Sequence, residues 1–244
     1  MSVKNMVKIF NQLQGSHDLY TVFNDFLEMS AIAISNSCDL VKKKQRKADY
    51  KKIIKKYTKD EQLIFPQILA ELVRTMEHIQ FGDVLGELFM QLELGSKWKG
   101  QFFTPYNLSV MCARMCLDNM DKLIEQNGFI TLNEPSVGGG AMVIAVAQVM
   151  KEHHYNPQKQ LKVVCNDLDI KSVYMTYIQL SLLGIPAKVI HQDTLSLEKF
   201  DTFRTPFWIL GMWEYRKEKV KTEPIVFNAV ENKKNVIDGQ LTMF

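Results

Sequence analysis

Apolar residues recur at helical spacing through the first hundred residues of the chain. After Ser16, a residue suited to the helix N-cap, the first stripe consists of Leu19, Val22, Phe23, Phe26 and Ser30. A second stripe runs over residues 64–76. Thr58 and Glu61 form a capping-box pattern ahead of it, and Asp83 is placed to cap a further helix. These stripes predict a helical region whose apolar faces form a core.

From about residue 128 the pattern changes to short apolar runs separated by segments of helix length. The runs read FITLNEP, LKVVCND and AKVIHQD, and helices are expected between them near 140–153 and 170–183. This alternation is typical of βαβαβ units with a parallel sheet. We therefore expect an α/β fold with a helical N-terminal region (1–98), a Rossmann-like domain (99–215) and a C-terminal tail (216–244).

Composition excludes several classes of protein. The chain has 244 residues, of which 46% are hydrophobic and 23% charged, as in ordinary globular proteins. The longest apolar stretches, 141–147 and 206–213, are shorter than the roughly 20 residues of a membrane span. The N-terminus lacks the apolar segment of a secretory signal, and the four cysteines have neither CxxC nor zinc-type spacing. We expect a cytoplasmic protein with no membrane segment and no metal site.

Positive charge is concentrated in residues 42–56, which carry nine Lys or Arg against one Asp, while the rest of the chain sums to −5. Lys and Arg bind nucleic-acid phosphates without regard to sequence. Ile53, Ile54 and Tyr57 also suit the apolar face of a solvated helix, which is the alternative interpretation. We favour DNA, with contacts from Lys42, Lys43, Lys44, Arg46, Lys47, Lys51 and Lys52.

A glycine-rich turn, Glu134-Pro-Ser-Val-Gly-Gly-Gly140, lies between a predicted strand and a predicted helix. Glycines let the backbone turn tightly and approach a ligand, and the helix N-terminus offers free N–H groups. Ligands of open α/β sheets lie at the carboxyl ends of the strands, where Glu134, Asp167 and Asp193 are expected. Asp167 is placed to accept both hydroxyls of a ribose. The turn therefore favours a nucleoside-containing cofactor over a purely structural role.

Upstream of this turn, residues 100–105 read GQFFTP. This block, the acid-Pro-x-x-Gly-x-Gly turn and the strand-end acid, in this order, resemble the adenine-N6 DNA methyltransferases of the type I modification-subunit kind over roughly residues 80–195. The resemblance implies a Rossmann-like methyltransferase sheet, S-adenosylmethionine as cofactor, DNA as substrate and a separate specificity subunit as partner. It assigns cofactor binding to Phe103, Thr104, Pro105, Glu134, Ser136, Gly138, Gly140, Asp167, Leu168 and Asp193.

The family clamps a flipped adenine with an Asn-Pro-Pro-aromatic block after its fourth strand. At the corresponding place this chain has Thr205, Pro206, Phe207 and Trp208, so a Thr hydroxyl would replace the amide acceptor. A buried strand would show the same residues. Only 51 residues follow Asp193, so we expect fewer strands than the usual seven.

Two functions therefore remain open. The intact cofactor blocks favour an adenine-N6 DNA methyltransferase, whereas the missing Asn favours a catalytically lapsed methyltransferase fold that serves as a binding module. A dinucleotide oxidoreductase would share the glycine turn but would leave GQFFTP without a role.

The last five residues resemble the QLxLF peptide with which bacterial DNA-processing proteins dock on the replication sliding clamp. Gln240 would bind at the rim of an apolar pocket that Leu241, Met243 and Phe244 fill. A terminal strand that pairs with the sheet would explain the same letters.

Overall fold

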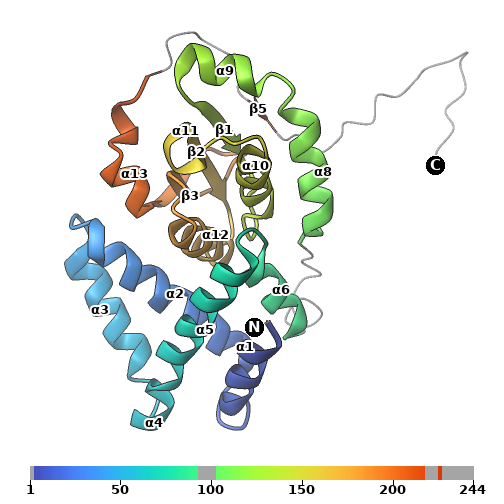
Figure 1. Ribbon diagram of the computed structural model, residues 1–244. Coiled ribbons are helices and arrows are strands. Elements are labelled where there is room, and N and C mark those ends of the chain that lie inside the picture. The colour runs from blue at the N-terminus through green and yellow to red at the C-terminus, as the bar shows by residue number, and fades with distance from the viewer. Residues whose placement is uncertain (1–2, 93–102, 218–224, 227–244) are drawn as a thin grey trace, which may run out of the picture.

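The computed structural model describes residues 3–92, 103–217 and 225–226. Its N-terminal part is helical (Figure 1). The elements of this part are α1 (Val3–Phe10), the 3-10 helix η1 (Asn11–Leu13), α2 (Leu19–Cys38), α3 (Lys43–Ile54), α4 (Lys59–Gln62), α5 (Ile64–Ile79) and α6 (Val84–Gln91).

The predicted helical stripes are buried. Phe65, Ile68, Leu72 and Met76 line one face of α5 at the expected spacing. Thr58 and Glu61 form the capping box of α4, as predicted. The N-cap of α2 differs from the prediction, because Asp18 rather than Ser16 accepts the backbone N–H of Thr21.

A five-stranded sheet forms the second part, in the order β4-β3-β2-β1-β5. Its strands are β1 (Ile130–Glu134), β2 (Leu161–Asp167), β3 (Ala187–Gln192), β4 (Lys199–Arg204) and β5 (Ile225–Val226). All neighbouring pairs are parallel except β3 and β4, which are antiparallel. The mixed α/β class is confirmed, and the described sheet has fewer than seven strands.

Helices connect and flank these strands. The connection from β1 to β2 carries α10 (Ala141–Glu152) and α11 (Pro157–Gln160), and that from β2 to β3 carries α12 (Ile170–Leu182). The remaining helices are α8 (Tyr106–Cys116), α9 (Met120–Asn127), α13 (Pro206–Leu210) and the 3-10 helix η2 (Trp213–Tyr215). The three predicted strands and both predicted helices of the βαβαβ unit are therefore present. In the described part of the chain no helix is long and apolar enough to cross a membrane.

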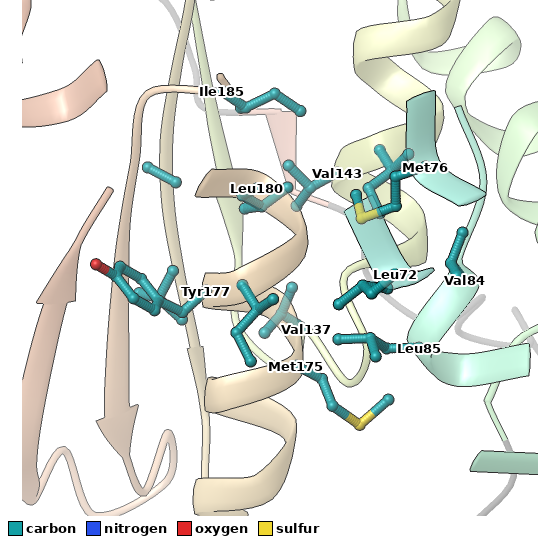
Figure 2. Packing of buried hydrophobic residues seen from close by; sticks show 14 of the residues in the cluster. Leu72, Met76, Val84, Leu85, Val137, Val143, Met175, Tyr177, Leu180 and Ile185 are labelled. Carbon is teal, nitrogen blue, oxygen red and sulfur yellow. The ribbon is translucent and has the colours of Figure 1, made fainter. Parts of the chain in front are cut away.

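One hydrophobic core joins the helical part to the sheet. Helix α12 packs on β2 and β3 and also on α2 and α6. Figure 2 shows this region, where Leu72 of α5 and Leu85 of α6 belong to the same cluster as Met175 of α12 and Val143 of α10. The predicted boundary between residues 98 and 99 lies outside the described residues, and the core itself is shared by the parts on either side of it.

Candidate functional site

The glycine turn after β1 has a backbone conformation that requires glycine. Gly138 has φ +56° and Gly140 has φ +95°, both in the left-handed region. The N–H of Gly140 donates to the carbonyl of Val137, which closes the turn just before α10 begins. We call residues 135–140 the elbow. The elbow thus joins the carboxyl end of β1 to the start of α10.

Asp167, the last residue of β2, bonds directly to the elbow. One carboxylate oxygen accepts the N–H of Gly138 at 2.8 Å, and the other accepts the N–H of Asp169 at 2.9 Å. Burial raises the pKa of Asp167, against the effect of these two donors, which lower it. Each oxygen has a second lone pair, so the carboxylate can still accept the hydroxyls of a ribose.

Glu134, the last residue of β1, is buried near the Asp167 carboxylate, with 5% of its surface exposed. One of its carboxylate oxygens accepts the N–H of Ser136 at 3.2 Å. Burial raises the pKa of Glu134, and the neighbouring charge of Asp167 raises it further. A buried carboxylate held by a single backbone donor is suited to bind a cationic or hydroxyl group of a ligand through its other oxygen.

The Phe-Thr-Pro block reaches the elbow through Phe103. A Cβ placed on Gly138 would lie 3.3 Å from the Phe103 ring, so only glycine leaves room for this contact without a shift. Phe103 also packs edge-on against Phe89 of α6, with ring centroids 5.3 Å apart. Thr104 and Pro105 are exposed. The first half of the block, residues 100–102, lies outside the described residues.

A cavity of about 470 Å³ adjoins the same block. Its wall is formed by Phe103–Tyr106, by the end of α5, by the segment that joins α5 to α6, and by α6 itself, with Asp83 and Glu87 among its polar residues. No residue of the elbow lines it. Phe103 therefore lies between the elbow and this hollow.

Asp193 follows the carboxyl end of β3, as expected. Its carboxylate accepts the N–H groups of Leu195 and Ser196, which lower its pKa and fix the turn toward β4. Leu168 is 60% exposed beside the site, and its carbonyl bonds to His191 at 3.0 Å.

Two residues that sequence reasoning missed tie the strand ends together. Asn166 donates to the carbonyl of Pro135 and to the hydroxyl of Thr194, and Thr194 donates to the same Pro135 carbonyl. The ends of β1, β2 and β3 are thus cross-linked by polar side chains. A polar residue beside the strand-end acid, as in Asn166-Asp167, is the only sequence sign of this arrangement.

The structure does not bring the expected base clamp, Thr205–Trp208, to the elbow. Because β4 runs antiparallel to β3, Arg204 pairs with Lys188 near the start of β3, whereas Asp193 follows its end. β3 has six residues, so the two ends are roughly 20 Å apart at about 3.3 Å per residue. Thr205 therefore lies at the edge of the sheet opposite the elbow.

The side chains of this block have structural partners instead. Thr205 is fully buried and caps α13, so the alternative of a buried strand is wrong as well. Trp208 is buried against Phe129 and Trp213, and its Nε1 donates to Glu214 at 3.1 Å. Pro206 is the first residue of the helix, and Phe207 is 36% exposed.

The basic segment forms α3, and its cations divide into two groups. Arg46 does not lie on the exposed surface predicted to contact DNA, since only 5% of its own surface is exposed. Its guanidinium lies over the Phe203 ring and is 3.5 Å from the Asp39 carboxylate. Lys42 pairs with Asp201 at 2.6 Å, and Lys52 is 3.5 Å from Asp49. Among the described residues, no ion pair is formed by the exposed residues Lys43, Lys44, Lys47 and Lys51.

The C-terminal residues Gln240, Leu241, Met243 and Phe244 lie outside the described residues, so clamp docking stays a prediction. Within the described ranges no group of three His, Cys, Asp or Glu side chains is arranged to hold a metal ion. All four cysteines are free thiols.

Comparison with known proteins gives one family match. The family model described as N-6 DNA Methylase matches residues 77–238, which is more than half of the chain and includes the Phe-Thr-Pro block, the elbow and Asp167. A comparison with curated proteins finds no significant match.

Two solved structures show a distant likeness. One is a type I restriction-modification system methyltransferase subunit from Streptococcus thermophilus, with 20% identity, a TM-score of 0.40, and coverage of 57% of this chain and 29% of that one. The other is described as a class I S-adenosylmethionine-dependent methyltransferase from Listeria monocytogenes, with 14% identity, a TM-score of 0.42, and coverage of 79% of this chain and 54% of that one. The chain thus spans between about a third and about half of the length of these proteins.

Proposed function

We propose that this chain, which belongs to the N-6 DNA methylase family, binds S-adenosylmethionine at the elbow and acts as an adenine-N6 DNA methyltransferase. The observation that carries the proposal is a convergence of three segments. At Gly138 the elbow leaves room for the ring of Phe103, and the N–H of Gly138 donates to the Asp167 carboxylate at 2.8 Å. These segments are far apart in sequence, and each is expected to contact the same ligand.

The residues present fit this cofactor. Asp167 has lone pairs left for the ribose hydroxyls, and the buried Glu134 carboxylate suits the ammonium of the amino-acid portion. A Cβ at Gly138 or Gly140 would intrude on Phe103 or Thr176. When bound, the cofactor supplies an activated methyl group, while the chain contributes binding and orientation.

DNA contact is the second part of the proposal, and α3 is its surface. Lys43, Lys44, Lys47 and Lys51 are exposed and free of ion pairs with described residues. A cluster of unpaired cations on one helix gives salt-dependent affinity for phosphates. Arg46, Lys42 and Lys52 are left out of this surface, because each already faces a carboxylate. Recognition of a target sequence would come from a separate specificity subunit.

The test has two stages on the same sample. Isothermal titration calorimetry with S-adenosylmethionine measures binding, and transfer of labelled methyl groups to unmethylated DNA then measures catalysis. We expect saturable binding and label recovered as N6-methyladenine. Absence of binding would refute the assignment of the elbow.

The placement of Thr205 favours one further candidate, a methyltransferase fold that binds its cofactor without transferring the methyl group. Within the described residues, no Asn-Pro-Pro-aromatic block lies at the carboxyl edge of the sheet. Cofactor binding without transfer would select this candidate, and the chain would then act as a binding module on DNA or on a partner protein.

A further inference from the structure

Helix α12 presents two polar side chains to the elbow although both are fully buried. Thr176 donates its hydroxyl to the carbonyl of Gly138 at 2.9 Å. Gln179, three residues later and therefore on the same face of the helix, donates its amide to the carbonyl of Gly139 at 2.7 Å. Two successive carbonyls of the elbow are thus held toward α12.

Gln179 also connects the elbow to the helical part of the chain. The same amide nitrogen donates to Asp83 at 2.8 Å, and its oxygen accepts the N–H of Leu85 at 3.1 Å. The Asp83 oxygen that accepts Gln179 also accepts the N–H of Gly86 at 2.9 Å, which caps α6. Both N–H groups of the Gln179 amide are therefore used, and its position is fixed on three sides.

Apolar contacts support this connection. Leu85, Val137 and Met175 are all buried in the core that joins α6, the elbow and α12. Figure 2 shows Leu85 of α6 pointing toward Val137 of the elbow. A Cβ on Gly139 would lie 3.0 Å from the Asp83 carboxylate, so the three segments are in close contact.

The hydrogen bonds to the carbonyls orient the N–H groups of the elbow. In a trans peptide the C=O and the following N–H point in opposite directions. Holding the Gly138 carbonyl toward Thr176 therefore turns the N–H of Gly139 away from α12. That N–H donates to no acceptor among the described residues. A run of three glycines would otherwise sample many conformations, and ordering it before the ligand arrives reduces the entropy lost on binding.

We propose that Thr176 and Gln179 are positioning residues that preorganise the elbow for S-adenosylmethionine, and that Asp83 holds Gln179 in place. This inference rests on the proposed function, since the elbow matters for affinity only if it binds the cofactor. It also makes the helical part of the chain a contributor to cofactor affinity through α6.

The test compares isosteric variants in the full chain. Thr176→Val removes the hydroxyl at constant shape, Thr176→Ser keeps it, and Gln179→Leu removes all three bonds of the amide. Ile178→Val is the control for a small loss of packing on the same helix, because Ile178 is fully buried and apolar. Urea denaturation first establishes that each variant is folded at the temperature used.

Two measurements are then made on each folded variant. Calorimetry gives the Kd of S-adenosylmethionine, and ¹⁵N-glycine labelling gives the amide resonance of Gly139 in the cofactor-free protein. We expect Thr176→Val to raise the Kd about tenfold and Gln179→Leu to raise it further. Thr176→Ser and Ile178→Val should bind with the wild-type Kd. The Gly139 resonance should move in Thr176→Val and stay in place in Thr176→Ser and Ile178→Val.

The outcomes separate this inference from the proposed function. Wild-type protein that fails to bind S-adenosylmethionine overturns both. Wild-type binding with an unchanged Kd in folded Thr176→Val and Gln179→Leu overturns the inference alone. An equal loss in Thr176→Ser also overturns it, because the effect would then come from packing and not from the hydroxyl. If Gln179→Leu does not fold, the two Thr176 variants decide the question.

Discussion

The hydroxyl of Thr205 can be tested directly for a structural role, as its hydrogen bonds indicate, against a catalytic one. Its hydroxyl donates to the carbonyl of Ile185 at 2.8 Å and accepts the N–H of Ala187 at 2.9 Å, and both bonds are buried. It also accepts the N–H of Trp208 at 3.4 Å as the N-cap of α13. The hydroxyl thus joins the start of β3 to the end of β4.

Thr205→Val keeps the shape of the side chain and removes these bonds. A buried group left without its partner costs about 1 to 3 kcal/mol, and loss of an N-cap costs about 1 kcal/mol. Two buried groups lose their partner and α13 loses its N-cap bond, so the free energy of unfolding should fall by about 3 to 7 kcal/mol. Thr205→Ser keeps the hydroxyl and should lose about 1 kcal/mol for the missing methyl group.

Urea denaturation followed by tryptophan fluorescence measures this difference, since Trp208 and Trp213 are buried close to the substituted residue. Cofactor affinity of the folded variant should equal that of the wild type. A loss of stability below about 0.5 kcal/mol would contradict the structural role. Methyl transfer that is lost in folded Thr205→Val and retained in Thr205→Ser would show that the hydroxyl is catalytic after all.

The cofactor site and the basic helix allow three further tests. Asp167→Asn should raise the Kd of S-adenosylmethionine at least tenfold in calorimetry. In the wild type each carboxylate oxygen accepts a backbone N–H, and the amide nitrogen of Asn cannot accept one. An unchanged Kd contradicts the ribose assignment. Burial raises the pKa of Asp83 above its ordinary value of 3.8, so the folded state binds the carboxyl proton more tightly than the unfolded chain does. The contribution of Asp83 to stability therefore falls as the pH rises from the unfolded-state pKa to the folded-state pKa. Asp83→Asn keeps the oxygen that both donors use, so its stability relative to the wild type should increase from pH 4 to pH 7 in urea denaturation, and a pH-independent difference would refute this. Replacing Lys43, Lys44 and Lys47 together by Glu should weaken DNA binding in fluorescence anisotropy and flatten its dependence on salt, by about 0.9 in the logarithmic slope for each phosphate that is no longer neutralised, whereas no change in slope would exclude α3 as the DNA surface.

Much of the cofactor site could be predicted from the sequence, because its parts are local. Glycines at 138 and 140 fall between a strand and a helix, and the structure gives both a positive φ. The acids Glu134 and Asp167 end parallel strands, and such ends meet at one edge of a sheet. The elbow, Phe103 and Asp167 are accordingly brought together, while their role in cofactor binding stays a proposal.

The supporting residues could not be found in this way. Thr176 and Gln179 are two polar positions in a helix with many buried residues, and nothing in the sequence indicates which backbone atoms they contact. Asp83 can be predicted as a helix cap, but its contact with Gln179 joins residues 96 positions apart. Such pairs depend on how helices pack, which periodicity does not specify.

By itself the sequence determined the apolar helices of the N-terminal part and the three strands and two helices of the βαβαβ unit, because the period of apolar residues and the capping residues act over a few neighbours. Only the tertiary structure decided that residues 199–204 form a strand beside β3, and with it the edge on which Thr205 lies. The pairing of strands depends on contacts between segments, and the six residues between β3 and β4 are too few for the crossover that a parallel pair needs. It likewise decided that Arg46 is buried over Phe203 while Lys43 stays in solvent. Charge can be counted along a chain, but burial depends on which surfaces the folded chain brings together.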